Sequence, residues 1–435
     1  MAEPRLNHTP EDEDEPRSSN APDDSWRSSY RQVMAIGEFR ALWLAHALST
    51  IGSNLLNIAA VTLVFQQTES PLAAGFTLAL TFLPPLIAGP LLSGVADILP
   101  RRRVMVGCDL LRASLIFAIG IPGVPLWAIW GLLFCSVLPT LPFAAARAAL
   151  LTEIVQGERY VAGLAIVQLT TQVGTLAGLA AGGYIAAMLG VNMAFMANGA
   201  VIVLAALIVL FGVRARPSPR AEATERPRLP VMIRDGSRLV FGDQRLRTLA
   251  LMAWLAGLYM VPYGLASPLA EQLGGGPTSA GLIMAGPFIG AFFGGFVLTR
   301  LIPPPTRIRM LGPLAVLASV PLLLWLFDPP LWLMIAALAV SGACSSYQIV
   351  ANAAFVLCVP KEGRGLAFGL VAAGLQTVQG LGILLAGLLA ESFNPNIVVV
   401  CAGAVGIALA AGLALPWSRL ASRTVELMNQ TEKAS

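Results

Sequence analysis

The chain has 435 residues, of which 56% are hydrophobic and only 12% are charged, and its formal net charge is +4. An average soluble domain contains roughly 25% charged residues. The composition therefore excludes an ordinary soluble protein and indicates that lipid covers most of the surface. The small positive charge comes mainly from arginines between apolar segments, so it does not indicate a nucleic-acid partner.

Apolar stretches of about 20 residues, the length that crosses a bilayer as a helix, recur along the chain. We expect the first helices near residues 40–66, 72–98, 103–122, 126–151, 161–187 and 191–213. A second set follows near residues 246–269, 277–300, 308–327, 330–358, 364–390 and 396–417. The sequence thus predicts an all-α membrane protein with twelve transmembrane helices.

Basic residues occur in alternate connections between these helices. They are Arg101 to Arg103, Arg159, the arginines of residues 214–247, Arg307, Arg309, Lys361 and Arg364. The intervening connections carry Glu69, Glu271, Asp328 and Glu391. Because Lys- and Arg-rich short loops stay in the cytosol, we expect a multi-pass protein of the cell membrane with both termini cytosolic. No secretory signal peptide is expected.

An internal repeat divides the chain. A shift of 206 residues places Gly163, Leu164, Leu169, Thr171 and Gly174 on identical residues, and it places Arg101 and Arg103 on Arg307 and Arg309. This indicates two parallel six-helix repeats. The predicted order is a disordered tail (1–37), an N-terminal bundle (38–213), a cytosolic linker (214–245), a C-terminal bundle (246–418) and a tail (419–435). Within the linker, residues 231–241 are either a helix on the membrane surface or irregular linker.

One loop carries a motif. Gly94, Asp97 and Arg101 to Arg103 follow the second helix, and this pattern resembles the signature between helices two and three of the major facilitator superfamily. Phe39 to Trp43, Asp109 to Arg112, Pro142 to Arg147, and Arg364 with Gly365 are similar to the branch that contains enterobactin exporters and macrolide efflux proteins. The resemblance implies the major facilitator fold and transport by alternating access.

The resemblance also implies a gate near the start of the eleventh helix, toward which Asp97 would point. The candidate gate residues are Gly94, Asp97, Arg101, Arg103, Asp109, Arg112, Arg147 and Arg364. We expect Asp109 and Arg112 to form a structural pair near the cytosolic end of the third helix. Arg147 either pairs with Glu153 or Asp109 as part of the gate, or attracts an anionic group of a substrate.

Polar side chains share faces on several helices that line the central cavity in this superfamily. The candidate cavity residues are His46, Thr50, Ser53 and Asn57 on the first helix, Gln168 and Gln172 on the fifth, Tyr259 and Tyr263 on the seventh, Gln348 and Asn352 on the tenth, and Gln376 and Gln379 on the eleventh. Polar groups are costly in lipid unless they face a cavity or one another. The alternative is that they only join helices by hydrogen bonds.

The sequence contains fewer signals for what drives transport. No Asp or Glu is expected in the middle of a helix, and Leu179 replaces the proline that is usual in the exporter signature of helix five. His46 is the one deep group of the first helix whose ordinary titration lies near neutral pH. We expect it either to carry a coupling proton or to be a hydrogen-bonded cavity residue.

Other function classes lack support. No Gly-rich phosphate-binding loop ends in Lys-Ser or Lys-Thr, and no nucleophile elbow or metal-ligand cluster occurs, so we predict neither an enzyme nor a cofactor. The leading hypothesis is a monomeric secondary exporter of a neutral or amphiphilic drug-like compound or secondary metabolite, driven by proton antiport. The alternatives are a lysophospholipid flippase or importing facilitator without proton coupling, and a transport-dead sensor that docks a partner through the acidic run from Glu11 to Glu15.

Overall fold

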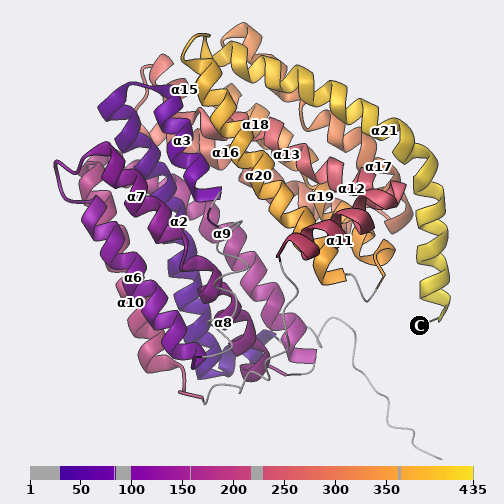
Figure 1. Cartoon of the computed structure of the whole chain (residues 1–435), viewed down its shortest axis with the longest axis horizontal. Coiled ribbons are helices and arrows are strands. Elements are labelled where there is room, and N and C mark those ends of the chain that lie inside the picture. The colour runs from indigo at the N-terminus through magenta and orange to yellow at the C-terminus, as the bar shows by residue number, and fades with distance from the viewer. Residues whose placement is uncertain are drawn as a thin grey trace, which may run out of the picture.

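The computed structural model describes residues 30–82, 84, 99–156, 158–216, 229–360 and 364–434. Within these ranges the regular secondary structure is helical and contains no strand. The helices form two groups, one from each half of the sequence (Figure 1). Gly94 and Asp97 of the predicted gate lie outside the described residues.

The N-terminal half is built around its first long helix. Its elements are α2 (Gly37–Thr68), α3 (Pro71–Phe82), α6 (Arg101–Ile119), α7 (Leu126–Val137), α8 (Thr140–Ile154), α9 (Glu158–Leu189) and α10 (Val191–Gly212). Helix α2 packs against α9 and α10, and α10 also packs against α6. A helical turn at residues 30–35 precedes α2, and its Val33 is buried.

The C-terminal half contains more and shorter elements. They are α12 (Gln244–Trp254), α13 (Ala256–Tyr259), α14 (Val261–Gly264), α15 (Ala266–Gln272), α16 (Pro277–Arg300), α17 (Pro304–Leu317), the 3-10 helix η1 (Val320–Phe327), α18 (Leu331–Ser345), α19 (Tyr347–Cys358), α20 (Arg364–Ala390) and α21 (Pro395–Ala434). Helix α21 continues well past residue 417, where the sequence predicted the last span to end.

Ten helical stretches in the described ranges are long and apolar enough to cross a membrane. Two of the twelve predicted spans are not among these ten, for separate reasons. Helix α3 is described only as far as Phe82, and α6 carries Arg101 to Arg103, Asp109 and Arg112 within 19 residues. The all-α membrane fold predicted from the sequence is confirmed, whereas the count of twelve spans stays a prediction.

Several spans that the sequence predicted as continuous are interrupted. The fourth is divided into α7 and α8 at Pro139, and the seventh into α12 to α15, with Pro262 in the first turn of α14. Proline cannot donate the backbone hydrogen bond of a helix interior, which accounts for the breaks at Pro139 and before Pro262, whereas the break at Leu255 is not beside a proline. The breaks bring Tyr259 and Tyr263 to the ends of short segments, where their side chains are buried.

The linker contains a regular element, α11 (Leu229–Gly242). This segment is helical rather than irregular, and its place on the membrane surface stays a prediction. Helix α11 packs against α20 and α12, and a Cβ on Gly236 would lie 3.2 Å from the Cγ of Leu366. The linker helix is therefore attached to the C-terminal half next to the start of α20.

The two halves contact each other at one end, through pairs of glycines. A Cβ on Gly183 of α9 would lie 2.6 Å from the carbonyl oxygen of Pro277 and 3.2 Å from the Cα of Gly281. On the other side, a Cβ on Gly387 of α20 would lie 2.8 Å from the carbonyl oxygen of Pro71. Only residues without a side chain allow such close helix contact. We call this end the closed end.

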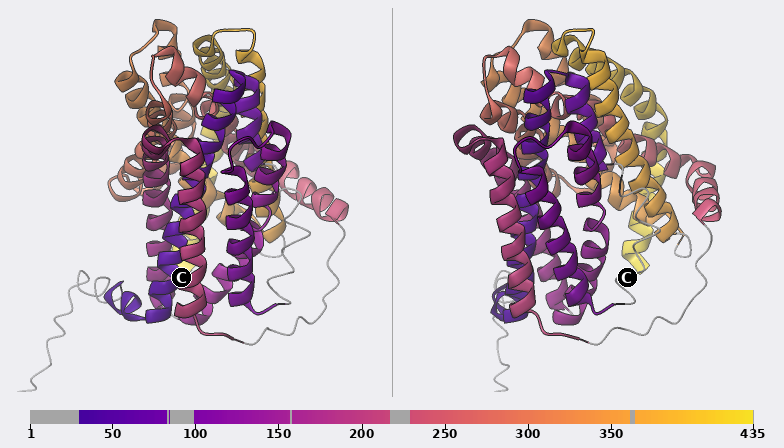
Figure 2. Two further views of the ribbon diagram at one scale, coloured as in Figure 1. Left: turned by 90° about the vertical axis from the view of Figure 1, so that its left-hand side faces the viewer. Right: turned by 60° about the vertical axis from the view of Figure 1, so that its left-hand side comes forward.

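A polar contact reinforces the closed end. The Ser70 hydroxyl donates a hydrogen bond to the Glu391 carboxylate, and the Leu72 backbone N–H donates to the same carboxylate at 3.0 Å. Toward the other end, which carries Arg101 and Arg216, the two halves diverge (Figures 1 and 2). We call this the basic end. Its ion pairs among described residues lie within one half of the molecule.

Candidate functional site

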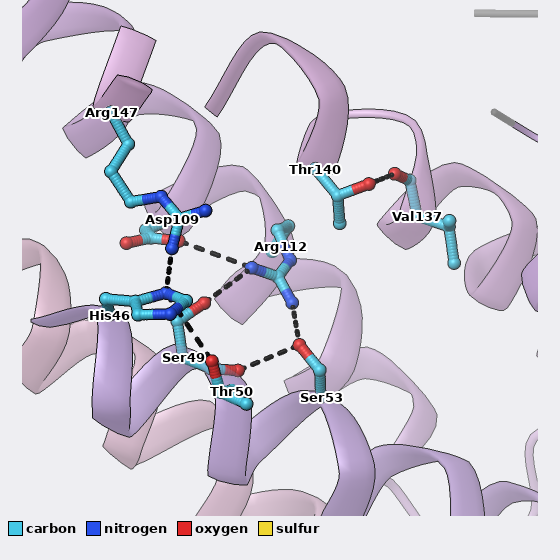
Figure 3. Close-up of polar contacts among 9 residues, drawn as sticks. All are labelled: His46, Ser49, Thr50, Ser53, Asp109, Arg112, Val137, Thr140 and Arg147. Carbon is cyan, nitrogen blue, oxygen red and sulfur yellow. Dashed lines mark hydrogen bonds and ion pairs between the residues drawn. The ribbon is translucent and has the colours of Figure 1, made fainter. Parts of the chain in front are cut away.

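A buried polar cluster in the N-terminal half begins at His46 of α2. The Nε2 atom of His46 lies 2.9 Å from the hydroxyl of Thr171 on α9. The guanidinium of Arg147 on α8 contacts Nδ1 (Figure 3). Arginine can only donate hydrogen bonds, so Nδ1 is the acceptor and the single ring proton is on Nε2. In this arrangement His46 is a neutral imidazole that joins three helices.

A second part of the cluster lies beside it, between α2 and α6. Arg112 donates to the hydroxyls of Ser49 at 3.1 Å and Ser53 at 2.9 Å, and lies 3.5 Å from the Asp109 carboxylate (Figure 3). Asp109 is fully buried and Arg112 is 3% exposed. The other carboxylate oxygen of Asp109 has no hydrogen-bond partner among the described residues. The pair is therefore a buried ion pair that is incompletely satisfied.

The position of Asp109 differs from the sequence-based expectation. Helix α6 runs from Arg101 to Ile119, so Asp109 lies midway along it rather than near its end. The expectation that no carboxylate occupies the middle of a helix was wrong, because this helix begins two residues and ends three residues earlier than the predicted range of 103–122. The expected pairing of Asp109 with Arg112 is present.

Arg147 has a different partner from either acidic residue that the sequence suggested. It contacts His46, whereas Glu153 pairs with Arg101 and, at 3.7 Å, with Arg216. Glu153 lies on an exposed face near the end of α8, between the buried Leu151 and Val155, so it can reach the arginines of the basic end. Arg147 itself remains within the bundle.

The rest of the predicted gate lies at the basic end. Arg101 pairs with Glu153, and the side chain of Arg103 is exposed. Arg364 begins α20, and its side chain lies outside the described part. The structure therefore brings together Asp109, Arg112 and Arg147 in neighbouring helices, and separates them from the Arg101 ion pair.

A second polar cluster lies in the C-terminal half, at the break in the seventh span. Gln348 of α19 donates to the Tyr259 hydroxyl, and Tyr347 donates to the backbone carbonyl of Met252 at 2.7 Å. The side chains of Tyr263 on α14 and Asn57 on α2 lie close enough to interact. This proximity links the two halves and two of the predicted cavity residues.

The remaining predicted cavity residues are more accessible. Gln168 and Asn352 are exposed, and Thr50, Gln172, Gln376 and Gln379 are partly exposed. Helices α9 and α20, which carry four of these glutamines, belong to opposite halves (Figure 1). Ser53, in contrast, is turned toward Arg112 inside the N-terminal half. The polar face predicted on α2 therefore serves two purposes. Ser53 binds Arg112 of the internal ion pair, and Asn57 faces the other half.

Sequence reasoning missed three contributors to these clusters. Ser49 and Tyr347 are adjacent to residues that were singled out, and Thr171 was noticed only as a repeat match. The spacing of Ser49, one helical turn before Ser53, was the available signal. The partner of each hydroxyl depends on how helices pack, which spacing along one helix does not reveal.

Comparison with known proteins agrees with the helical architecture. The family model described as Major Facilitator Superfamily matches residues 42–327 and 249–433. Macrolide efflux protein A of Streptococcus pyogenes is 23% identical over 397 residues, covering 86% of this chain and 94% of that protein.

Solved structures share the fold. A bacterial homologue of the human lysosomal transporter Spinster, in an inward-facing and occupied conformation, matches with a TM-score of 0.65 at 17% identity, covering 91% of this chain and 97% of that one. A peptide transporter in complex with sulfate matches with a TM-score of 0.71 at 12% identity, covering 92% of this chain and 99% of that one. The resemblance stated from the sequence is thus confirmed, and the chain belongs to the Major Facilitator Superfamily of membrane transporters.

Proposed function

We propose that this transporter is a secondary exporter that moves a neutral or amphiphilic organic compound by alternating access. The observation that carries the proposal is that the halves contact each other at the closed end and diverge at the basic end. The match to macrolide efflux protein A along nearly its whole length supports a drug-like or secondary-metabolite substrate. The positive charge of the basic end supports assigning it to the cytosol.

In this proposal the substrate enters from the basic end and binds between α9 and α20. Glutamine amides on these helices offer uncharged hydrogen-bonding groups, and Tyr263 with Asn57 forms the boundary toward the closed end. Export requires the glycine contacts of the closed end to separate and the basic end to close. The binding site then opens to the opposite side of the membrane.

Proton antiport is the second element of the proposal, and Asp109 is the better candidate for the coupling proton. Its free carboxylate oxygen is buried beside Arg112, and Arg112 also holds two hydroxyls of α2. A proton on Asp109 removes the anion that positions Arg112, which changes the contact between α6 and α2. His46 is already engaged on both ring nitrogens.

The direction of transport is testable in cells that lack their own efflux pumps. Cells that express the unaltered chain should accumulate less of a lipophilic fluorescent macrolide than cells that express the Gly183→Leu variant. In this variant the leucine side chain should keep the two halves apart at the closed end, so that transport fails. Equal accumulation in both strains would contradict the proposal. Higher accumulation with the unaltered chain would indicate an importer or a flippase-like facilitator.

A further inference from the structure

A pocket of about 330 Å³ lies at the closed end, between the two halves. One wall is formed by Thr62 and Gln66 of α2, and the other by Ser267 and Glu271 of α15. On each helix the two residues are four apart, so they share a face. The pocket thus has a short hydroxyl side chain and a longer polar side chain on each side. The cavity glutamines Gln168, Gln172, Gln376 and Gln379 are not among the residues that line it.

The two hydroxyls of this pocket are buried and lack partners. Thr62 is 4% exposed and Ser267 is 6% exposed, and neither hydroxyl oxygen has a hydrogen-bond partner among the described residues. Helical Ser and Thr usually donate to the carbonyl one turn earlier, as Thr68 does to Val64 at 2.7 Å. A buried hydroxyl without a partner is unfavourable, so a ligand group that reaches either hydroxyl from the pocket gains a hydrogen bond there.

The charge and shape of the pocket define the ligand chemistry. Glu271 is the one charged residue among the described residues that line it. The aromatic ring of Phe65 also contributes to the wall, and an aromatic face attracts cations. A carboxylate, two hydroxyls, an amide and an aromatic ring together complement an organic ammonium ion that bears hydroxyl groups.

We propose that this pocket is a binding site for a small hydroxylated amine, such as an amino alcohol or an amino sugar, separate from the central substrate site. Because α2 and α15 belong to different halves, the two walls separate when the closed end opens. A ligand that binds only one state shifts the population toward that state. Occupancy therefore holds the closed end shut and inhibits the transport cycle from that side.

Binding can be measured on the purified full-length chain without any transport assay, so the result is independent of the function proposed above. Glucosamine serves as the probe and glucose as its uncharged counterpart. We expect saturable glucosamine binding that is weakened about tenfold or more by Glu271→Gln and by the double substitution Thr62→Val with Ser267→Ala. Glucose should bind about tenfold more weakly than glucosamine. Ser114→Ala, which removes an exposed hydroxyl of α6, is the matched control and should leave binding unchanged.

The conformational effect needs its own readout. Spin labels at Gln67 and Ser392, exposed residues near the closed end in opposite halves, report its opening in a variant without the five native cysteines. Glucosamine should increase the population with the shorter distance, and it should fail to do so in Glu271→Gln. Absence of saturable binding, binding that all the pocket variants retain, equal binding of glucose, or an unchanged distance distribution would overturn the proposal.

Discussion

The ion pair of Asp109 and Arg112 places two charges in the buried interior of the N-terminal half. Charges inside a membrane protein are rare and usually functional, and here the pair is held by Ser49 and Ser53 rather than by solvent. Breaking a buried pair by removing one partner leaves an uncompensated charge. The pair therefore suits a residue whose charge changes during the cycle.

Substitution Asp109→Asn should abolish the dependence of transport on a proton gradient. It should also lower the free energy of unfolding by about 3 kcal/mol, because Arg112 remains buried without an anion. Thermal unfolding in detergent and vesicle uptake measure the two effects. The double substitution Asp109→Asn with Arg112→Gln should recover stability but not coupling. If Asp109→Asn retains full gradient dependence, Asp109 does not carry the proton.

Arg147 gives a second prediction at this scale. Arg147→Ala removes the donor to His46 Nδ1, which loosens the connection between α8 and α2. We expect substrate binding to be retained while transport falls about tenfold or more, since the substrate site lies elsewhere. Binding by fluorescence anisotropy and uptake in vesicles distinguish the steps. Lost binding with retained transport would instead assign Arg147 to substrate attraction.

Which residues share a helical face was predictable from spacing, and His46, Thr50 and Ser53 do lie in one polar region of α2 (Figure 3). The hydrogen-bond partners of these residues were not predictable from spacing. Ser53 binds Arg112 of α6, and Arg147 binds His46 rather than an acidic residue. Such partners are set by the rotation of each helix against its neighbours, which a single sequence does not encode in any short pattern.

At the scale of helices, the contact between the halves depends on backbones without side chains. Gly183 with Gly281, and Gly75 with Gly387, bring α9 to α16 and α3 to α20. That α9 meets α16, and α3 meets α20, at these glycines was not evident from the sequence. The lengths of the apolar stretches predicted where the spans lie. The breaks at Pro139 and Pro262 were not predicted and became visible only in the structure.

Substitution Gly183→Leu should prevent the closed end from forming, because a Cβ there already lies 2.6 Å from a carbonyl oxygen. The expected result is a shift toward longer distances between spin labels at Gln67 and Ser392. Gly131→Ala is the control, since a Cβ at Gly131 meets nothing within 4 Å. An unchanged distance distribution for Gly183→Leu would show that these glycines do not determine closure.

For the molecule as a whole, the internal repeat predicted two related halves, and the structure has two groups of helices. The conformational state was not predictable. Alternating states of a transporter share most local contacts and differ by a few kcal/mol, so the sequence specifies both. The contacts of the closed end and the divergence at the basic end identify the state present here.

The orientation in the membrane is a further prediction for the whole molecule. Arg101, Arg214 and Arg216 form ion pairs at the basic end, which should face the cytosol. A green fluorescent protein fused to either terminus should therefore fluoresce in bacteria, because it does not mature after export across the inner membrane by the general secretion pathway. A dark fusion at either end, with the protein present in the membrane, would contradict the proposed topology.

The most direct test of proton-coupled export is uptake of a lipophilic fluorescent compound into inverted membrane vesicles, with and without an imposed proton gradient. The unaltered chain should accumulate the compound only with the gradient. Asp109→Asn should lose this dependence, and His46→Ala should keep it. Accumulation that ignores the gradient in the unaltered chain would contradict antiport and favour a facilitator or flippase, and loss of gradient dependence in His46→Ala alone would move the coupling proton to His46.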